Sequence, residues 1–108
     1  GYSIGDVIFD PTQNVKVCFM SKFDTPLIEL VEPVDTNSPI KNILQKNGVS
    51  PYHICYELDN INDGILKLKL KKFVPLSKPV PARALNDRLI CFLYNRDVGL
   101  IELLQKEK

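Results

Sequence analysis

The chain repeats two short stretches of sequence at one fixed spacing. Val17-Cys18-Phe19 matches Ile90-Cys91-Phe92, and Leu27-Ile28-Glu29-Leu30 matches Leu100-Ile101-Glu102-Leu103 without a change. Both matches lie 73 positions apart, since 91 − 18 = 73 and 102 − 29 = 73. A repeat of this period indicates that one supersecondary unit occurs twice. A chain of 108 residues has room for one small domain, so the two units must share it.

The first copy of the repeat reads as a run of strands. Alternation of apolar and polar residues predicts strands, and the residues Asp10-Pro11 and Pro33 end two of them. The expected strands are Ile4–Phe9, Asn14–Met20 and Leu27–Glu32. Ser38-Pro39 should then begin a short helix with Ser38 as its N-cap, and Asn47-Gly48 should end it.

The second copy contains a helix as well. Asn60 is expected to cap a helix that carries Ile61, Ile65 and Leu68 on one side. A loop with three prolines should run to about Asp87. The expected strands are Tyr52–Leu58, Phe73–Leu76, Arg88–Tyr94 and Leu100–Leu104. The order strand, helix, strand, strand, strand predicts a mixed α+β fold.

The first copy lacks the opening strand and helix that the second copy has. His53 opens the second copy, and its counterpart would fall about twenty residues before Gly1, because 53 − 73 = −20. We expect either that the chain is a fragment or that a natural protein has lost this element.

Charge and composition disfavour several classes of protein. The net charge is +1, from 14 Lys and Arg against 13 Asp and Glu, so no field of one sign favours nucleic acid or an anionic membrane as partner. No apolar run approaches the ~20 residues that a membrane span requires, and no signal-peptide pattern opens the chain. Three cysteines suggest buried thiols in a reducing compartment. We expect a soluble, cytoplasmic protein.

One local stretch is strongly basic. Lysines alternate with leucines between Lys67 and Lys72. We interpret this stretch as a solvated helix face in preference to a phosphate-binding face.

Three residues could carry chemistry. Glu29 and Glu102 each stand in a strand whose other residues are apolar on both faces, so each carboxylate must be paired, protonated, bound to metal or at a sheet edge in water. His53 is the only histidine, and it is either a structural residue or a ligand. One imidazole and two carboxylates would suit Mn, Co, Ni, Zn or Mg.

Four segments carry a resemblance to a known family. They are Asp10–Val17, Leu27–Ile40 with its Ser-Pro-Ile motif, Pro51–Glu57 with Tyr-His-Ile, and Gly99–Leu103. In this order they resemble the vicinal-oxygen-chelate superfamily, and within it most of all methylmalonyl-CoA epimerases and glyoxalase I-like proteins.

The resemblance implies a fold and a metal site. The fold would be two paired βαβββ modules in a single domain, 1–108, with an incomplete first module 1–47 and a second module 51–108. Glu29, His53 and Glu102 match three of the family's four ligand positions for a divalent metal ion. The fourth ligand belongs to the first strand of the family, and no residue here fills that position.

The resemblance also implies an activity. A complete member would be a metal-dependent isomerase or lyase that acts on a small oxygen-chelating substrate through a stabilised enolate. Glu29 or Glu102 would move the proton, and Arg83 and Arg88 are weaker candidates for substrate binding. The family also predicts a homodimer. The alternatives are a metal-free protein that binds or sequesters small molecules, and an inactive truncated member.

Overall fold

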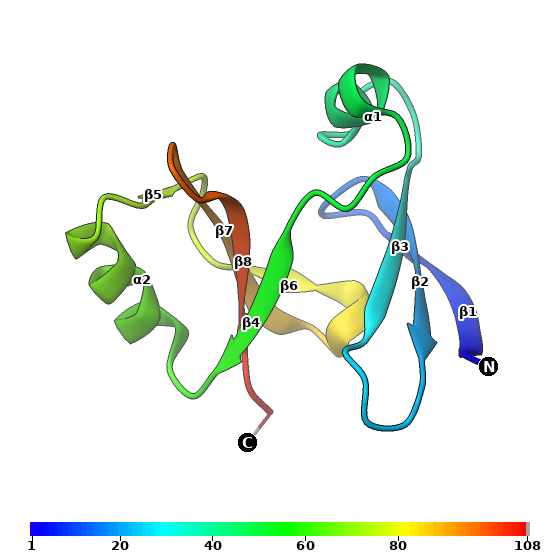
Figure 1. Ribbon diagram of the computed structural model, residues 1–108, viewed down its shortest axis with the longest axis horizontal. Helices are drawn as coiled ribbons and strands as arrows, with labels where there is room; N and C mark the ends of the chain where they lie inside the picture. The colour runs from blue at the N-terminus through cyan, green and yellow to red at the C-terminus, as the bar shows by residue number, and fades with distance from the viewer. Residues whose placement is uncertain (108) are drawn as a thin grey trace. The chain divides into compact units, whose positions relative to one another are not determined.

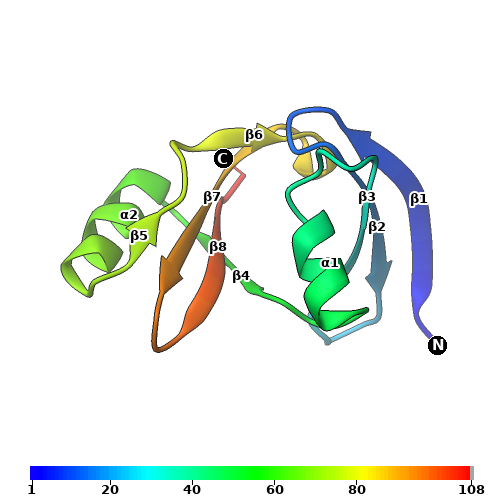
Figure 2. The same ribbon diagram turned by 90° about the horizontal axis from the view of Figure 1, so that it is seen from above.

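The computed structural model describes residues 1–107 and divides the chain into two compact units, residues 1–50 and residues 51–108. Each unit is built on its own β-sheet, and helices are few (Figures 1 and 2). The mixed α+β class expected from the sequence is confirmed. Among residues 1–107, neither helix is long and apolar enough to cross a membrane.

The first unit is a three-stranded antiparallel sheet followed by a short helix. The strands β1 (Ser3–Asp10), β2 (Val15–Ser21) and β3 (Ile28–Pro33) lie in the order β1-β2-β3, and α1 spans Lys41–Asn47. Figure 2 shows the three strands side by side, with β1 at one edge. All three strands agree with those predicted from the alternation of residues.

The start of α1 differs from the prediction. Ser38 does not cap the helix, because the N-cap is Ile40 and no side chain bonds to the first turn. Instead the Ser38 N–H donates to the carbonyl oxygen of Asp35 at 3.1 Å, and the Ser38 carbonyl accepts from the Lys41 N–H at 3.2 Å. Ser38 therefore belongs to two consecutive turns ahead of the helix. The end is as expected, with Gly48 at a φ of +67° that suits glycine.

The second unit is a mixed sheet covered by one helix. Its elements are β4 (Ile54–Leu58), α2 (Ile61–Leu70), β5 (Val74–Pro75), β6 (Val80–Ala82), a 3₁₀ turn (Arg83–Leu85), β7 (Arg88–Asn95) and β8 (Gly99–Gln105). The sheet order is β4-β8-β7-β5, and β6 also pairs with β7. β4 runs parallel to β8, whereas the other pairs are antiparallel.

Two details of the second unit can be compared with the predictions made from the sequence. The Asn60 side chain accepts a hydrogen bond from the Asp63 N–H at 3.0 Å, so the predicted cap of α2 is confirmed. The proline-rich segment was expected to be a loop, but it contains β6 and a 3₁₀ turn. Pro81 is compatible with a strand here because β6 pairs with β7 alone among the described strands, and an edge strand tolerates a missing N–H.

The core of the second unit lies between α2 and one face of β7 and β8 (Figure 1). Its buried members are Ile61, Cys91, Leu93, Ile101 and Leu103. Burial raises the pKa of the Cys91 thiol, so this cysteine stays neutral and packs as an apolar group. The expectation of buried thiols is correct for Cys91 but wrong for Cys55, which is exposed.

The strand registers show the repeat directly. Phe19 pairs with Glu29 across β2 and β3, and Phe92 pairs with Glu102 across β7 and β8. The other pairs of the two hairpins follow the same offset of 73 positions, for example Cys18 with Leu30 and Cys91 with Leu103. The two glutamates therefore occupy equivalent positions, each directly opposite a phenylalanine on the neighbouring strand.

The two hairpins differ in what covers their apolar face. In the second unit α2 packs on Ile101 and Leu103, which are 8% and 4% exposed. Their counterparts in the first unit, Ile28 and Leu30, are 39% and 51% exposed. The first unit thus presents to solvent the apolar face that a helix covers in the second.

Candidate functional site

His53 and Glu102 meet in the second unit. His53 lies directly before β4, and Glu102 lies in the middle of β8, the strand that runs parallel to β4. The His53 Nε2 atom is 3.0 Å from the Glu102 Oε1 atom, which is hydrogen-bond distance. The parallel pairing of β4 with β8 brings the start of one strand beside the centre of the other, and this explains how residues 49 positions apart come into contact.

Both side chains of this pair are buried. His53 exposes 9% of its side chain and Glu102 exposes 7%. The other ring nitrogen of His53, Nδ1, is buried and has no hydrogen-bond partner within residues 1–107. Buried polar atoms without a partner are rare, and a common reason for one is an ion or a water molecule at the site. The buried, unpartnered Nδ1 atom therefore makes this pair a candidate functional site.

Two aromatic rings fix the orientation of the imidazole. The Phe92 ring lies edge-on to His53, with 5.0 Å between the ring centroids, and the Tyr52 ring lies at 4.5 Å. Phe92 is directly opposite Glu102 in the β7–β8 ladder, so one residue contacts the histidine and flanks the glutamate. The sequence analysis did not identify Phe92 as a site residue, although the signal was present, because Phe92 belongs to the repeated triplet.

The donor atoms of the pair fit a divalent metal ion. Two ligand atoms on adjacent corners of an octahedron with bonds of ~2.1 Å lie ~3.0 Å apart, and the Nε2 and Oε1 atoms have this separation. Imidazole nitrogen and carboxylate oxygen are both common ligands of Zn, Co, Ni and Mn. Without a metal the same two atoms form a hydrogen bond, which the Nε2–H tautomer of the ring can donate to the carboxylate.

Glu29, the third predicted ligand, lies in the first unit. It is in β3 and is half-buried, in contrast to the buried Glu102. Its place opposite Phe19 repeats the place of Glu102 opposite Phe92. Glu29 and Glu102 thus occupy equivalent register positions in their own sheets, and the role of Glu29 as a ligand stays a prediction.

The two arginines that were candidates for substrate binding have different surroundings. Arg88 is 18% exposed in its side chain, and its Nη1 atom lies 2.6 Å from the Oε2 atom of Glu57. Its Nε–H also donates to the Leu85 carbonyl oxygen at 3.1 Å. Arg83 is exposed and lies 3.8 Å from Asp87. Arg88 is therefore held by the protein, and Arg83 is a surface residue.

A family comparison fits this arrangement. Residues 1–92 match the model of the family described as glyoxalase/bleomycin resistance protein/dioxygenase superfamily. The chain belongs to this superfamily. The resemblance inferred from the sequence, to vicinal-oxygen-chelate proteins, is thereby confirmed.

Relatives of this superfamily member include named epimerases. It is 37% identical to human mitochondrial methylmalonyl-CoA epimerase over 97% of its own length and 60% of that protein. It is 32% identical to ethylmalonyl-CoA/methylmalonyl-CoA epimerase of Cereibacter sphaeroides over 97% of its own length and 80% of that protein. The chain thus spans about three fifths of the length of the human and mouse epimerases that it matches.

A solved structure confirms the glyoxalase-superfamily fold. Methylmalonyl-CoA epimerase from Mycobacterium tuberculosis has a TM-score of 0.86 to this chain, with 18% identity, over all of this chain and 73% of that one. At this identity the likeness shows the fold.

Proposed function

We propose that the protein is a metal-dependent isomerase of the methylmalonyl-CoA epimerase type. The observation that carries the proposal is the buried pair of His53 and Glu102, whose donor atoms are 3.0 Å apart and whose imidazole is held by Phe92. Two relatives are named as epimerases of acyl-CoA thioesters, and these names favour epimerisation over the other reactions of the superfamily.

Three residues would form the proposed metal site. His53 and Glu102 would hold the cation, and Glu29 would complete the set from β3, as the family resemblance implies. A divalent cation bound there would act as a Lewis acid and stabilise the negative charge that develops on two neighbouring substrate oxygens. Zn, Ni, Co, Mn and Mg all remain candidates.

The two glutamates differ in fitness for proton transfer. Glu102 is buried and hydrogen-bonded to His53, which suits a ligand that keeps its position. Glu29 is half-buried, which suits a carboxylate that exchanges a proton with a substrate. We therefore assign Glu29 as the stronger candidate base. If the cation holds it weakly, it would take the proton from the carbon between the thioester and the carboxylate, and a proton from solvent delivered to the opposite face would then invert that carbon.

The test of this function is isotope exchange. Protein supplied with each candidate divalent cation is incubated with methylmalonyl-CoA of one configuration in D₂O. We expect the substrate to gain one deuterium at the inverted carbon, measured by mass spectrometry, and a chelator to stop the gain. Binding of the thioester without exchange, with every cation tried, would favour the metal-free binding protein over the enzyme.

The proposal includes a homodimer. Within residues 1–107, β1 pairs with β2 alone, so one edge of β1 is open. Ile4, Val7 and Phe9 on this strand are 71%, 68% and 49% exposed. An open edge with apolar side chains favours pairing with another chain. Light scattering should give twice the mass of the chain, and Val7→Lys should halve it; a monomeric parent protein at high concentration would refute the dimer.

A further inference from the structure

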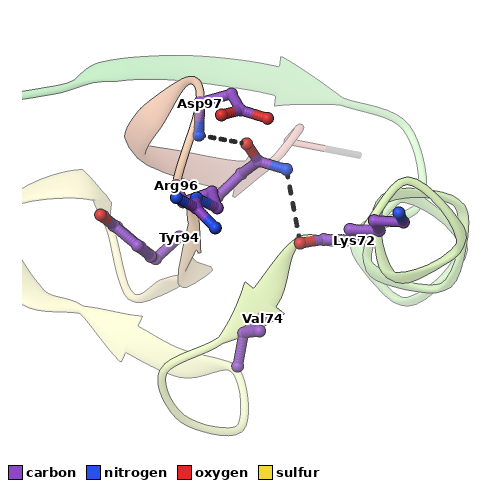
Figure 3. A pocket seen from close by; sticks show the side chains of 6 residues that line it. Lys72, Val74, Tyr94, Arg96 and Asp97 are labelled. Atoms are coloured by element: carbon purple, nitrogen blue, oxygen red, sulfur yellow. Dashed lines mark hydrogen bonds between the residues drawn. The ribbon is translucent and has the colours of Figure 1, made fainter.

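A second pocket in the second unit has a different chemistry from the His53–Glu102 pair. It has a volume of about 530 Å³ and lies between the segment that follows α2 and the tip of the β7–β8 hairpin (Figure 3). We call it the hairpin pocket. Its lining residues are Lys72, Val74, Tyr94, Asn95, Arg96 and Asp97.

Asn95 holds the two walls of the hairpin pocket together. Its amide Nδ2 donates to the carbonyl oxygens of Lys71 and Lys72, both at 3.4 Å, and so ties the hairpin to the end of α2. Its Oδ1 accepts from the N–H groups of Asp97 at 2.8 Å and Val98 at 3.2 Å. Figure 3 shows the bond to the Lys72 carbonyl oxygen, which crosses between the walls, and the bond from the Asp97 N–H, which lies within the hairpin turn. One side chain thus fixes the backbone on both sides, so the pocket is formed before any ligand arrives.

The lining of the hairpin pocket is cationic with an aromatic surface. Lys72 and Arg96 make no ion pair with any residue in the described part of the chain. Asp97 is the one carboxylate among the lining residues. The Tyr94 side chain is 48% exposed and Val74 is 59% exposed. Two cations beside an exposed ring suit a ligand that carries phosphate groups and a flat heterocycle.

One wall of the hairpin pocket, at Tyr94, lies on the sheet face that carries Glu102. Phe92 stands opposite Glu102, and Tyr94 is two residues farther along β7, so its side chain points to the same face. Asn95, the last residue of β7, is three residues beyond Phe92, a distance of roughly 10 Å at the rise of an extended strand, and Arg96 follows it in the turn. A substrate with its acyl end at Glu102 and its phosphates in the hairpin pocket must therefore have a long linker.

We propose that the hairpin pocket binds the phosphorylated nucleotide end of an acyl-CoA thioester while its acyl end lies at His53 and Glu102. This inference rests on the proposed function, because the relatives' names indicate a CoA thioester. CoA joins its thioester to its phosphates through a long pantetheine arm, which matches the separation of the two sites. Lys72, at the end of the basic stretch Lys67–Lys72, then binds phosphate, and the lysines on α2 remain a solvated helix face.

The first test separates the nucleotide from the acyl group. A Lys72→Ala/Arg96→Ala double variant is assayed by isotope exchange with methylmalonyl-CoA and with the methylmalonyl thioester of pantetheine, which lacks the nucleotide. We expect KM for the CoA thioester to rise about tenfold, the scale of two partly exposed ion pairs. The kcat value and all constants for the pantetheine thioester should stay within twofold. Lys41→Ala/Lys46→Ala, with the same change of charge on α1, should leave both substrates unaffected.

The second test needs no enzymatic activity. Adenosine 3′,5′-bisphosphate, the nucleotide end of CoA, is titrated into the protein by calorimetry. We expect binding that weakens with added salt, weakens about tenfold in the Lys72/Arg96 double variant, and tightens in Asp97→Asn, which removes the carboxylate from the pocket.

The two tests fail in different ways. Nucleotide binding that depends on Lys72 and Arg96, in a protein without isotope exchange, would keep the nucleotide site and refute the epimerase. Exchange of methylmalonyl-CoA with KM unchanged in the double variant, together with unchanged nucleotide affinity, would overturn the hairpin pocket and leave the epimerase intact.

Discussion

Glu102→Gln is expected to lower both metal affinity and the rate of isotope exchange by more than about 100-fold. Groups that only orient a metal ligand already contribute up to roughly 100-fold in affinity, and Glu102 is proposed as a ligand itself. Glutamine keeps the shape of the side chain and can still accept a hydrogen bond from His53, so the fold should persist. Elemental analysis after dialysis gives the metal content, and deuterium gain gives the rate.

The control for Glu102→Gln is Glu57→Gln. Glu57 is also in the second unit and is paired with Arg88, but its side chain is 49% exposed and no proposed role depends on it. The control should keep its metal and its exchange rate. His53→Ala should resemble Glu102→Gln, with circular dichroism to show that each variant is folded. Full metal content in both site variants would mean that the cation binds somewhere else, and the proposed site would be wrong.

The sequence predicted the fold well because local signals and the long-range repeat agree. Alternating residues gave the strands of both hairpins, and Asn60 gave the start of α2. The repeat went further, because the equal offset of Glu29 and Glu102 correctly implied the equal registers of the two hairpins. Where the prediction failed, at Ser38 and in the proline-rich segment, the structure depends on turns and edge pairing that leave no periodic signal.

The site was predicted less completely than the fold. From the residues alone, Glu102 could have been buried with a partner or at a sheet edge in water, and the structure shows it buried beside His53. Only the family resemblance placed His53 and Glu102 at one site, because their contact depends on the parallel pairing of β4 with β8. Parallel pairing joins segments that are distant in sequence, and no local pattern marks it. The same holds for the hairpin pocket. The basic stretch Lys67–Lys72 was visible in the sequence. The role of Asn95, which joins the two walls of the hairpin pocket, was not.

The largest effect on stability is expected for Leu93→Ala. Leu93 is fully buried between α2 and the sheet, where it packs with Ile61 and Leu103. Truncation of a buried leucine to alanine removes apolar contact and leaves a cavity, at a cost of about 2–5 kcal/mol in the free energy of unfolding. The free energy of unfolding of natural domains is only about 5–15 kcal/mol in total. A small unit would therefore lose a large part of its stability. The expected fall in Tm is at least about 8 °C, measured by thermal and urea unfolding.

Leu89→Ala is the matched control for Leu93→Ala. Leu89 is in the same strand, β7, and has the same chemical type, but it is 37% exposed and lies opposite Pro81 of the edge strand β6. The change in strand propensity is equal in the two variants, so the difference between them isolates the cost of the buried cavity. We expect Leu89→Ala to lower the free energy of unfolding by less than half as much as Leu93→Ala. Equal losses would show that the layer between α2 and β7 is not the main source of stability, and the described core would then be wrong.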